Sequence, residues 1–137
     1  MPDGDPLLAS DEPPAREIFD ALGRGNAVIV CDHASNCIPR RLNGLGLGPV
    51  ELASHIAWDP GAAEVARRLA EHLVAPLVVS GYSRLVIDCN RPLASEESIA
   101  PASAGVVVPG NQSVGAADRA LRCAALFRPY HRAIAEV

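Results

Sequence analysis

Residues 27–36 read A-V-I-V-C-D-H-A-S-N, and this stretch decides the fold and raises the question of function. The run from Ala27 to Cys31 is short, continuous and rich in Val and Ile, which predicts a strand buried on both faces, as in a parallel sheet. It ends at two ionisable residues, Asp32 and His33, and a loop of small polar residues follows. In open α/β sheets, ligands bind outside the carboxyl ends of the strands. The pair therefore stands where a site is expected.

The pattern along the rest of the chain predicts an α/β domain. The expected elements are a short helix at 16–22, a loop at 39–49, a helix at about 61–74, strands at 77–79 and 85–89, a brief strand at 106–108 and a long amphipathic helix at about 114–136. This order favours a mainly parallel sheet flanked by helices, with helical crossovers. Residues 1–14 contain four prolines and four acids, which predicts a flexible arm before a single domain at 15–137.

Composition limits the classes of partner. The chain has 137 residues and a formal net charge of -4, which argues against nucleic acid or an anionic membrane as the main partner. The longest apolar stretches are too short to cross a membrane. None of the four cysteines forms a C-x-x-C pair, and the first residues are acidic and Pro-rich, which does not resemble a secretory signal. We therefore expect reduced thiols and a cytoplasmic protein.

Polar clusters stand at the predicted ends of strands or starts of helices. His33 offers the widest chemistry, because imidazole is both a metal ligand and a general base, but it would equally serve as a structural histidine in a turn. Asp32 would assist His33, or it would accept hydrogen bonds within a turn. Asp59, which precedes Pro60, also fits ordinary helix capping. From the residues alone, these alternatives remain open.

A second group of polar residues points to an anionic ligand. Asn90 and Arg91 would clamp a carboxylate, because Arg offers a bidentate fork and Asn adds a directional donor. Alternatively, Arg91 would pair with Asp88 or with a backbone carbonyl. No spacing in the sequence fixes a zinc ion as H-E-x-x-H does. The residues by themselves support an α/β domain with a polar crevice suited to a small anion.

Four motifs, taken together and in order, resemble the N-formylglutamate amidohydrolase family. They are V-C-D-H-A-S-N-C-I-P at 30–39, H-I-A-W-D-P-G-A-A-E-V-A-R-R-L-A at 55–70, S-R-L-V-I-D-C-N-R-P at 83–92 and F-R-P-Y-H-R-A-I at 127–134. The resemblance implies a fold similar to zinc carboxypeptidases and aspartoacylases. It also implies hydrolysis of N-formyl-L-glutamate, or a related N-acyl amino acid, to formate and L-glutamate, a late step of histidine degradation.

The resemblance also assigns roles to residues. His33 matches the family's strand-end histidine and is the expected ligand of Zn²⁺ or another divalent metal. Asn36 stands where zinc carboxypeptidases place a ligating Glu, so we expect Asp32 or Asp59 to supply the catalytic carboxylate. We also expect Asn36 to contact the substrate. Asn90 and Arg91 look like the pair that holds a substrate carboxylate, and Arg84 matches a family arginine suited to the second carboxylate. The expected substrate is therefore a small dianionic N-acyl amino acid.

Length is the main departure from the family. Family members continue with a further strand, so the resemblance implies a domain that is incomplete at its C-terminal end. The alternative function is a non-catalytic remnant that binds a carboxylate, or a fragment that folds with a partner. An exposed sheet edge would then favour self-association. A third interpretation is an α/β fragment that binds no ligand.

Overall fold

The computed structural model describes residues 6–137, and it confirms an α/β domain. Of the predicted arm, residues 1–5 lie outside the described residues. Residues 6–14 lie against the domain, where Leu7 is buried in the core and the carbonyl of Pro13 accepts a hydrogen bond of 2.7 Å from the Tyr82 hydroxyl.

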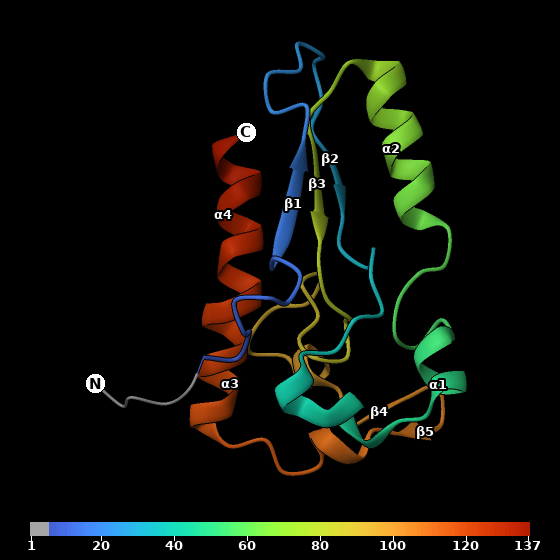
Figure 1. The fold of residues 1–137 in the computed structure, drawn as a ribbon, viewed down its shortest axis with the longest axis vertical. Helices are drawn as coiled ribbons and strands as arrows, with labels where there is room; N and C mark the ends of the chain where they lie inside the picture. The colour runs from blue at the N-terminus through green and yellow to red at the C-terminus, as the bar shows by residue number, and fades with distance from the viewer. Residues whose placement is uncertain (1–5) are drawn as a thin grey trace.

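A three-stranded sheet forms the centre of the upper half of the molecule (Figure 1). Its strands are β1 (Arg16–Phe19), β2 (Ile29–Cys31) and β3 (Leu77–Ser80), in the order β1-β3-β2. β3 pairs parallel with β2 and antiparallel with β1, so the sheet is mixed rather than mainly parallel. The helix predicted at 16–22 is wrong, because residues 16–19 extend along β3 instead, and such pairing commonly overrides local propensity.

β2 is an edge strand of this sheet, and this position changes its burial. The sequence predicted a strand buried on both faces, but Val28 and Val30 are 41% and 43% exposed. Only Cys31 of β2 is fully buried. Among the described strands, β2 pairs with β3 alone, so one of its long sides is open.

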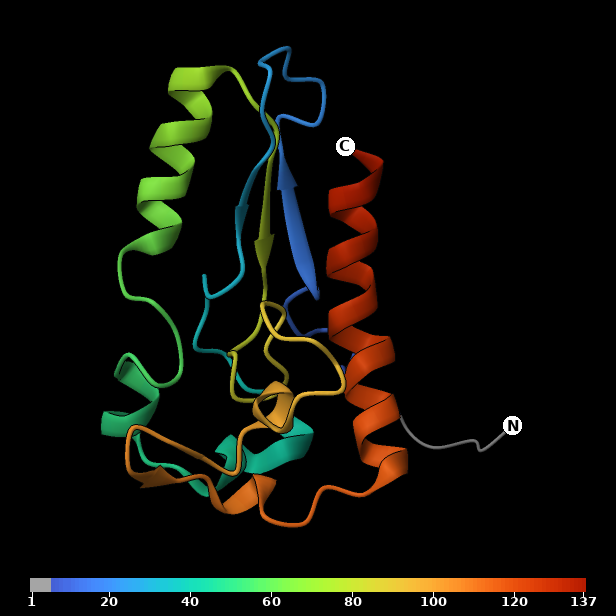
Figure 2. The ribbon, with the colours of Figure 1, turned by 180° about the vertical axis from the view of Figure 1, so that it is seen from behind.

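Two helices cover the two faces of the sheet, as Figures 1 and 2 show from opposite sides. α2 (Ala62–Leu73) confirms the predicted amphipathic helix; it packs on β2 and β3 through its small residues Ala66 and Ala70. α4 (Arg128–Glu136) packs on β1 and β3. Asp59 was expected to cap α2, but Gly61 takes that place with a φ of 87°.

The C-terminal helix predicted at 114–136 is continuous but not uniform. It consists of α3 (Ala116–Arg122), a π-helical turn η4 (Cys123–Phe127) and α4. Pro129 has no N–H to donate, and a π turn just before it accommodates that loss. The buried side of this helix consists of Arg122, Cys123, Leu126, Tyr130 and Ala133.

Short elements and loops form the lower half of the molecule, below the carboxyl ends of β2 and β3 (Figure 2). They include the 3₁₀ helix η1 (Arg40–Gly46), α1 (Pro49–Ala53), η2 (Glu96–Ile99), the hairpin β4 (Ala102–Ser103) and β5 (Val106–Val107), and η3 (Pro109–Asn111). The brief strand at 106–108 is thus confirmed in β5, whereas 39–49 contains helical turns rather than a plain loop. Within residues 6–137, no helix is both long enough and apolar enough to cross a membrane.

The prediction of a strand at 85–89 is wrong, although the predicted burial of this segment is confirmed. Leu85, Val86 and Ile87 are at most 2% exposed and belong to the larger hydrophobic core. Residues 84–86 form a turn, so this segment runs through the core without sheet partners. The apolar run reflects burial beneath loops, which a strand pattern alone does not distinguish.

Candidate functional site

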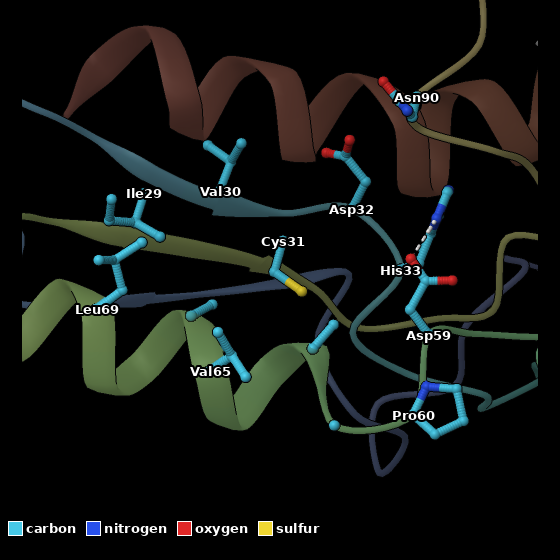
Figure 3. A pocket seen from close by; sticks show the side chains of 13 residues that line it. Ile29, Val30, Cys31, Asp32, His33, Asp59, Pro60, Val65, Leu69 and Asn90 are labelled. Carbon is cyan, nitrogen blue, oxygen red and sulfur yellow. Dashed lines mark hydrogen bonds and ion pairs between the residues drawn. The ribbon is translucent and has the colours of Figure 1, made fainter.

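His33 lies just beyond the carboxyl end of β2, where its ring is held between two carboxylates. Its Nε2 is 2.7 Å from Oδ1 of Asp88, and its Nδ1 is 3.2 Å from Oδ2 of Asp59. Figure 3 shows the contact with Asp59. The Asp59 backbone N–H also donates to the His33 carbonyl at 2.9 Å, which joins the end of β2 to the start of the α2 region. Because carboxylates only accept hydrogen bonds, both contacts are satisfied together when His33 is protonated.

Asp88 is the most buried charged group of the site, with a side chain only 4% exposed. Its Oδ1 also accepts the Asn90 backbone N–H at 2.9 Å. Its Oδ2 accepts from Nη2 of Arg84 at 3.1 Å, and Nε of Arg91 lies 4.0 Å away. A buried carboxylate is tolerated only where opposite charges and hydrogen bonds replace its hydration. Asp88 therefore has a complete set of partners, of which His33 is the closest.

The pKa values of this pair move in opposite directions. The hydrogen bond to Asp88 raises the pKa of His33 above its ordinary value of 6.5, and this effect outweighs the opposing effect of burial. Burial is the largest influence on Asp88 and raises its pKa. The hydrogen bonds from His33 and Asn90, with the positive charges nearby, together lower that pKa below 3.8. The pair is therefore ionised in both members across the range between these values.

Two arginines stand beside Asp88. Arg84 is 26% exposed and also reaches Asp59, with 3.7 Å between its Nη1 and Oδ1 of Asp59. Arg91 is 45% exposed and pairs with Glu97 at 3.1 Å. Arg84, Arg91 and Glu97 line a hollow of about 190 Å³ together with Asp88. This hollow presents two guanidinium groups that are partly open to solvent, which suits a small anion.

A larger open groove of about 610 Å³ runs along β2 and α2 (Figure 3). Ile29, Val30, Val65 and Leu69 give it apolar walls. Its polar end is lined by Asp32, His33, Asp59 and Asn90. The groove therefore joins an apolar surface on the open side of β2 to the ionisable residues that follow this strand.

The predicted site residues fall into three groups. His33, Arg84 and Arg91 contact Asp88, Asp59 contacts His33 and Arg84, and Asn90 lines the groove beside them. Asp32 also lines the groove, but its Oδ1 accepts a hydrogen bond from the hydroxyl of Tyr130 in α4. Burial, followed by this bond, raises the pKa of Tyr130, so the phenol stays a donor. Asn36 lies apart, where its amide donates to the Leu52 carbonyl at 2.8 Å.

Sequence reasoning missed the central role of Asp88, which it considered only as a partner for Arg91. A usable signal was present, because Asp88 is a charged residue within the predicted buried strand at 85–89, and Arg84 stands just before it. Buried opposite charges are almost always paired. That rule marks Asp88 as a group that needs a partner, but the strand prediction held residues 84 and 88 too far apart to pair.

The described residues do not fit a complete zinc site. Among residues 6–137, no group of three or more His, Cys, Asp and Glu side chains is arranged to hold a metal ion. Both ring nitrogens of His33 face carboxylates, and a protonated imidazole cannot ligate a metal. Metal ligation by His33 would therefore require it to lose a proton and release Asp88 or Asp59.

The pH dependence of stability tests the His33–Asp88 pair. Because the pKa of His33 is raised in the folded state, His33 contributes stability that is fully present below pH 6.5. This contribution is lost as the pH rises through the pKa of the folded state. Because the pKa of Asp88 is lowered in the folded state, Asp88 contributes stability that is present above pH 3.8. This contribution is lost as the pH falls through the pKa of the folded state. We expect Asp88→Asn to lower the free energy of unfolding by about 1–3 kcal/mol at about pH 5, and by less at about pH 9. Urea unfolding of the wild type and the variant at the two pH values measures the free energy of unfolding.

Asp59→Asn is the matched control, because Asp59 is half exposed and its bond to His33 is longer. It should cost less than Asp88→Asn at the lower pH. An equal cost of Asp88→Asn at both pH values would contradict an ionised pair.

Comparison with known proteins identifies the family of this chain. The chain matches the N-formylglutamate amidohydrolase family over residues 25–137. It is similar to the crystal structure of gene product Atu2144 from Agrobacterium tumefaciens, with a TM-score of 0.92 and 41% sequence identity. The match covers 95% of this chain and 52% of that chain, so this chain spans about half the length of its structural relative. A search of curated proteins found no match. Because the family match includes most of the sequence, the chain belongs to the N-formylglutamate amidohydrolase family.

Proposed function

We propose that this domain forms part of an amidohydrolase active site that converts N-formyl-L-glutamate, or a related N-acyl amino acid, to formate and the free amino acid. The observation that carries the proposal is His33, held between Asp88 and Asp59 at the polar end of a groove, with Arg84 beside both carboxylates. Family membership supports the reaction class. Histidine degradation as the pathway and the cytoplasm as the location both remain predictions from the sequence.

Hydrolysis of the formyl amide needs a group that takes a proton from water and a group that returns one to the leaving nitrogen. Water adds its oxygen to the formyl carbon, the C–N bond breaks, and the amine leaves with the proton. Asp59 is suited to the first task, because its carboxylate is 52% exposed and lines the groove. His33 holds Asp59 in place from one side while Asp88 holds His33 from the other. Asp32, at the same end of the groove, is the second candidate base.

A dianionic substrate is supported by the arginines. Arg84 and Arg91 line the smaller hollow with partly exposed guanidinium groups, and Asn90 lines the larger groove. We propose that they hold the two carboxylates of the amino acid and leave the formyl group near His33. Asn36 has a weaker basis for substrate contact, since its amide already donates to the backbone at Leu52.

Activity tests the proposal directly. The purified chain, supplied with Zn²⁺, should release formate from N-formyl-L-glutamate, and His33→Ala should lower kcat/KM by about 100-fold or more. Arg84→Gln should act chiefly on KM, because it removes charge that binds the substrate. Arg68→Gln is the control, since Arg68 pairs with Glu64 on the exposed side of α2. A folded, zinc-supplied chain that releases no formate would contradict the proposal for this chain.

Zinc, and the likeness to zinc carboxypeptidases, are separate proposals that rest on the resemblance. Because residues 6–137 offer no group of three donors, any zinc at His33 should be held weakly. We therefore expect activity to be lost after dialysis against a chelator and restored by added Zn²⁺, with less than one zinc per chain after desalting. Analysis of metal content measures the zinc retained after desalting, and formate release measures the loss and recovery of activity. Full zinc retention that His33→Ala abolishes would show that His33 leaves its carboxylates to bind metal.

A second candidate is a carboxylate-binding domain that needs another polypeptide to complete it. The open side of β2 favours this function, because Val28 and Val30 are exposed on the strand and Val65 and Leu69 are exposed on the helix beside it. An unpaired strand with apolar neighbours is a template for further pairing.

Self-association tests the open edge. The purified chain should form dimers or larger species as its concentration rises, and Val30→Lys should shift it toward monomer because edge lysines block strand pairing. Val50→Lys is the matched control in α1, where Val50 is 80% exposed. Light scattering after gel filtration measures the mass. A chain that stays monomeric at high concentration would rule out self-association through this edge.

A further inference from the structure

Residues 84–88 carry both Arg84 and Asp88, yet they belong to no strand or helix themselves. Leu85, Val86 and Ile87 are buried in the core, and residues 84–86 form a turn. Buried backbone carbonyls must have hydrogen-bond partners. The carbonyls of this segment have no sheet ladder, so their partners decide how firmly the two site residues are placed.

Side chains from two distant elements supply these partners. The amide of Asn111, at the end of η3, donates to the Leu85 carbonyl at 2.7 Å and to the Ala100 carbonyl at 2.9 Å. Nη1 of Arg122, at the end of α3, donates to the Val86 carbonyl at 3.1 Å and to Oδ1 of Asn111 at 2.7 Å. The two side chains thus bind each other and two successive carbonyls of the segment.

Arg122 is itself fixed. It is 1% exposed, and its Nε and Nη2 donate to the two carboxylate oxygens of Asp118 at 3.2 and 3.0 Å. A bidentate pair of this kind fixes the plane of the guanidinium group. All three nitrogens of the guanidinium are therefore engaged, and solvent hardly reaches them.

A second arginine of α3 supports the other end of the segment. Nη1 of Arg119 donates to Oγ of Ser98 at 2.8 Å, and the carbonyl of Ser98 accepts the Asp88 backbone N–H at 2.7 Å. Ser98 is completely buried. Helix α3 therefore anchors the segment near both site residues, although neither Arg119 nor Arg122 lines the groove or the smaller hollow.

We propose that Arg122 and Asn111 are positioning residues, which fix the backbone at Leu85 and Val86 and so set where Arg84 and Asp88 stand relative to His33. The effect on catalysis rests on the proposed function, whereas the effect on the segment does not. Lysine cannot replace Arg122, because one ammonium group cannot reach Val86, Asn111 and both oxygens of Asp118 in one plane.

Residue-resolved amide exchange by NMR tests the placement. In Arg122→Lys, the amides of Val86 and Asp88 should exchange about tenfold faster or more, while those of Val78 and Val79 in β3 should change by less than about twofold. Arg132→Lys, the same exchange at an exposed position of α4, should change neither group. If Arg122→Lys does not fold, Asn111→Ser decides the matter by the same comparison. Unchanged exchange at Val86 and Asp88 in a folded variant would overturn the proposal.

Kinetics with N-formyl-L-glutamate separate this proposal from the proposed function. If the wild type releases formate, Arg122→Lys should raise KM and lower kcat, each by about tenfold, because both Arg84 and Asp88 shift. Unchanged kcat and KM in a variant with a loosened segment would overturn the positioning role. If the wild type releases no formate while the segment still loosens, the proposed function fails and the placement of Arg84 and Asp88 by Arg122 stands.

Discussion

The carboxylate of Asp88 must be neutralised inside the protein, and much of the lower half of the structure depends on how this is achieved. Its partners come from the end of β2 through His33, from the turn through Arg84, and from its own following loop through Asn90. Removing one partner of a buried charge leaves an uncompensated ion, which costs several kcal/mol. The parts of the chain that meet at Asp88 are therefore tied to one another by electrostatics as well as by apolar packing.

The elements that were predicted correctly are those whose signal is local. β3 and α2 follow from a short apolar run and from helical periodicity. β1 was predicted as a helix because its pairing partners lie at residues 77–80, some sixty positions away. The segment 85–89 was predicted as a strand because burial beneath loops and burial in a sheet give the same apolar pattern. Local patterns indicate burial more reliably than they indicate the partner.

The residues of the candidate site also divide into those with a local signal in the sequence and those whose importance depends on distant contacts. His33 was found from its position after an apolar run, and the resemblance supplied its role and pointed to Arg84. The importance of Asp88 depends on a contact with His33 that spans 55 positions, and that of Arg122 on one with Val86 that spans 36. Nothing in the neighbourhood of Arg122 in the sequence distinguishes it from an arginine on an exposed helix face. Only its burial with Asn111 shows that the helix holds the segment that carries Arg84 and Asp88.

The π-helical turn at Cys123–Phe127 has a consequence for the whole C-terminal helix. Arg122 precedes the turn and binds the backbone beneath the site, while Tyr130 follows it and binds Asp32 at the groove. An α-helix advances by about 100° per residue, so the wide turn resets the angle between these two side chains. A single continuous helix thereby serves two regions of the molecule that face different directions. One irregular turn therefore sets the rotation of α4 relative to α3, so that Arg122 binds Val86 and Tyr130 binds Asp32 from the same helix.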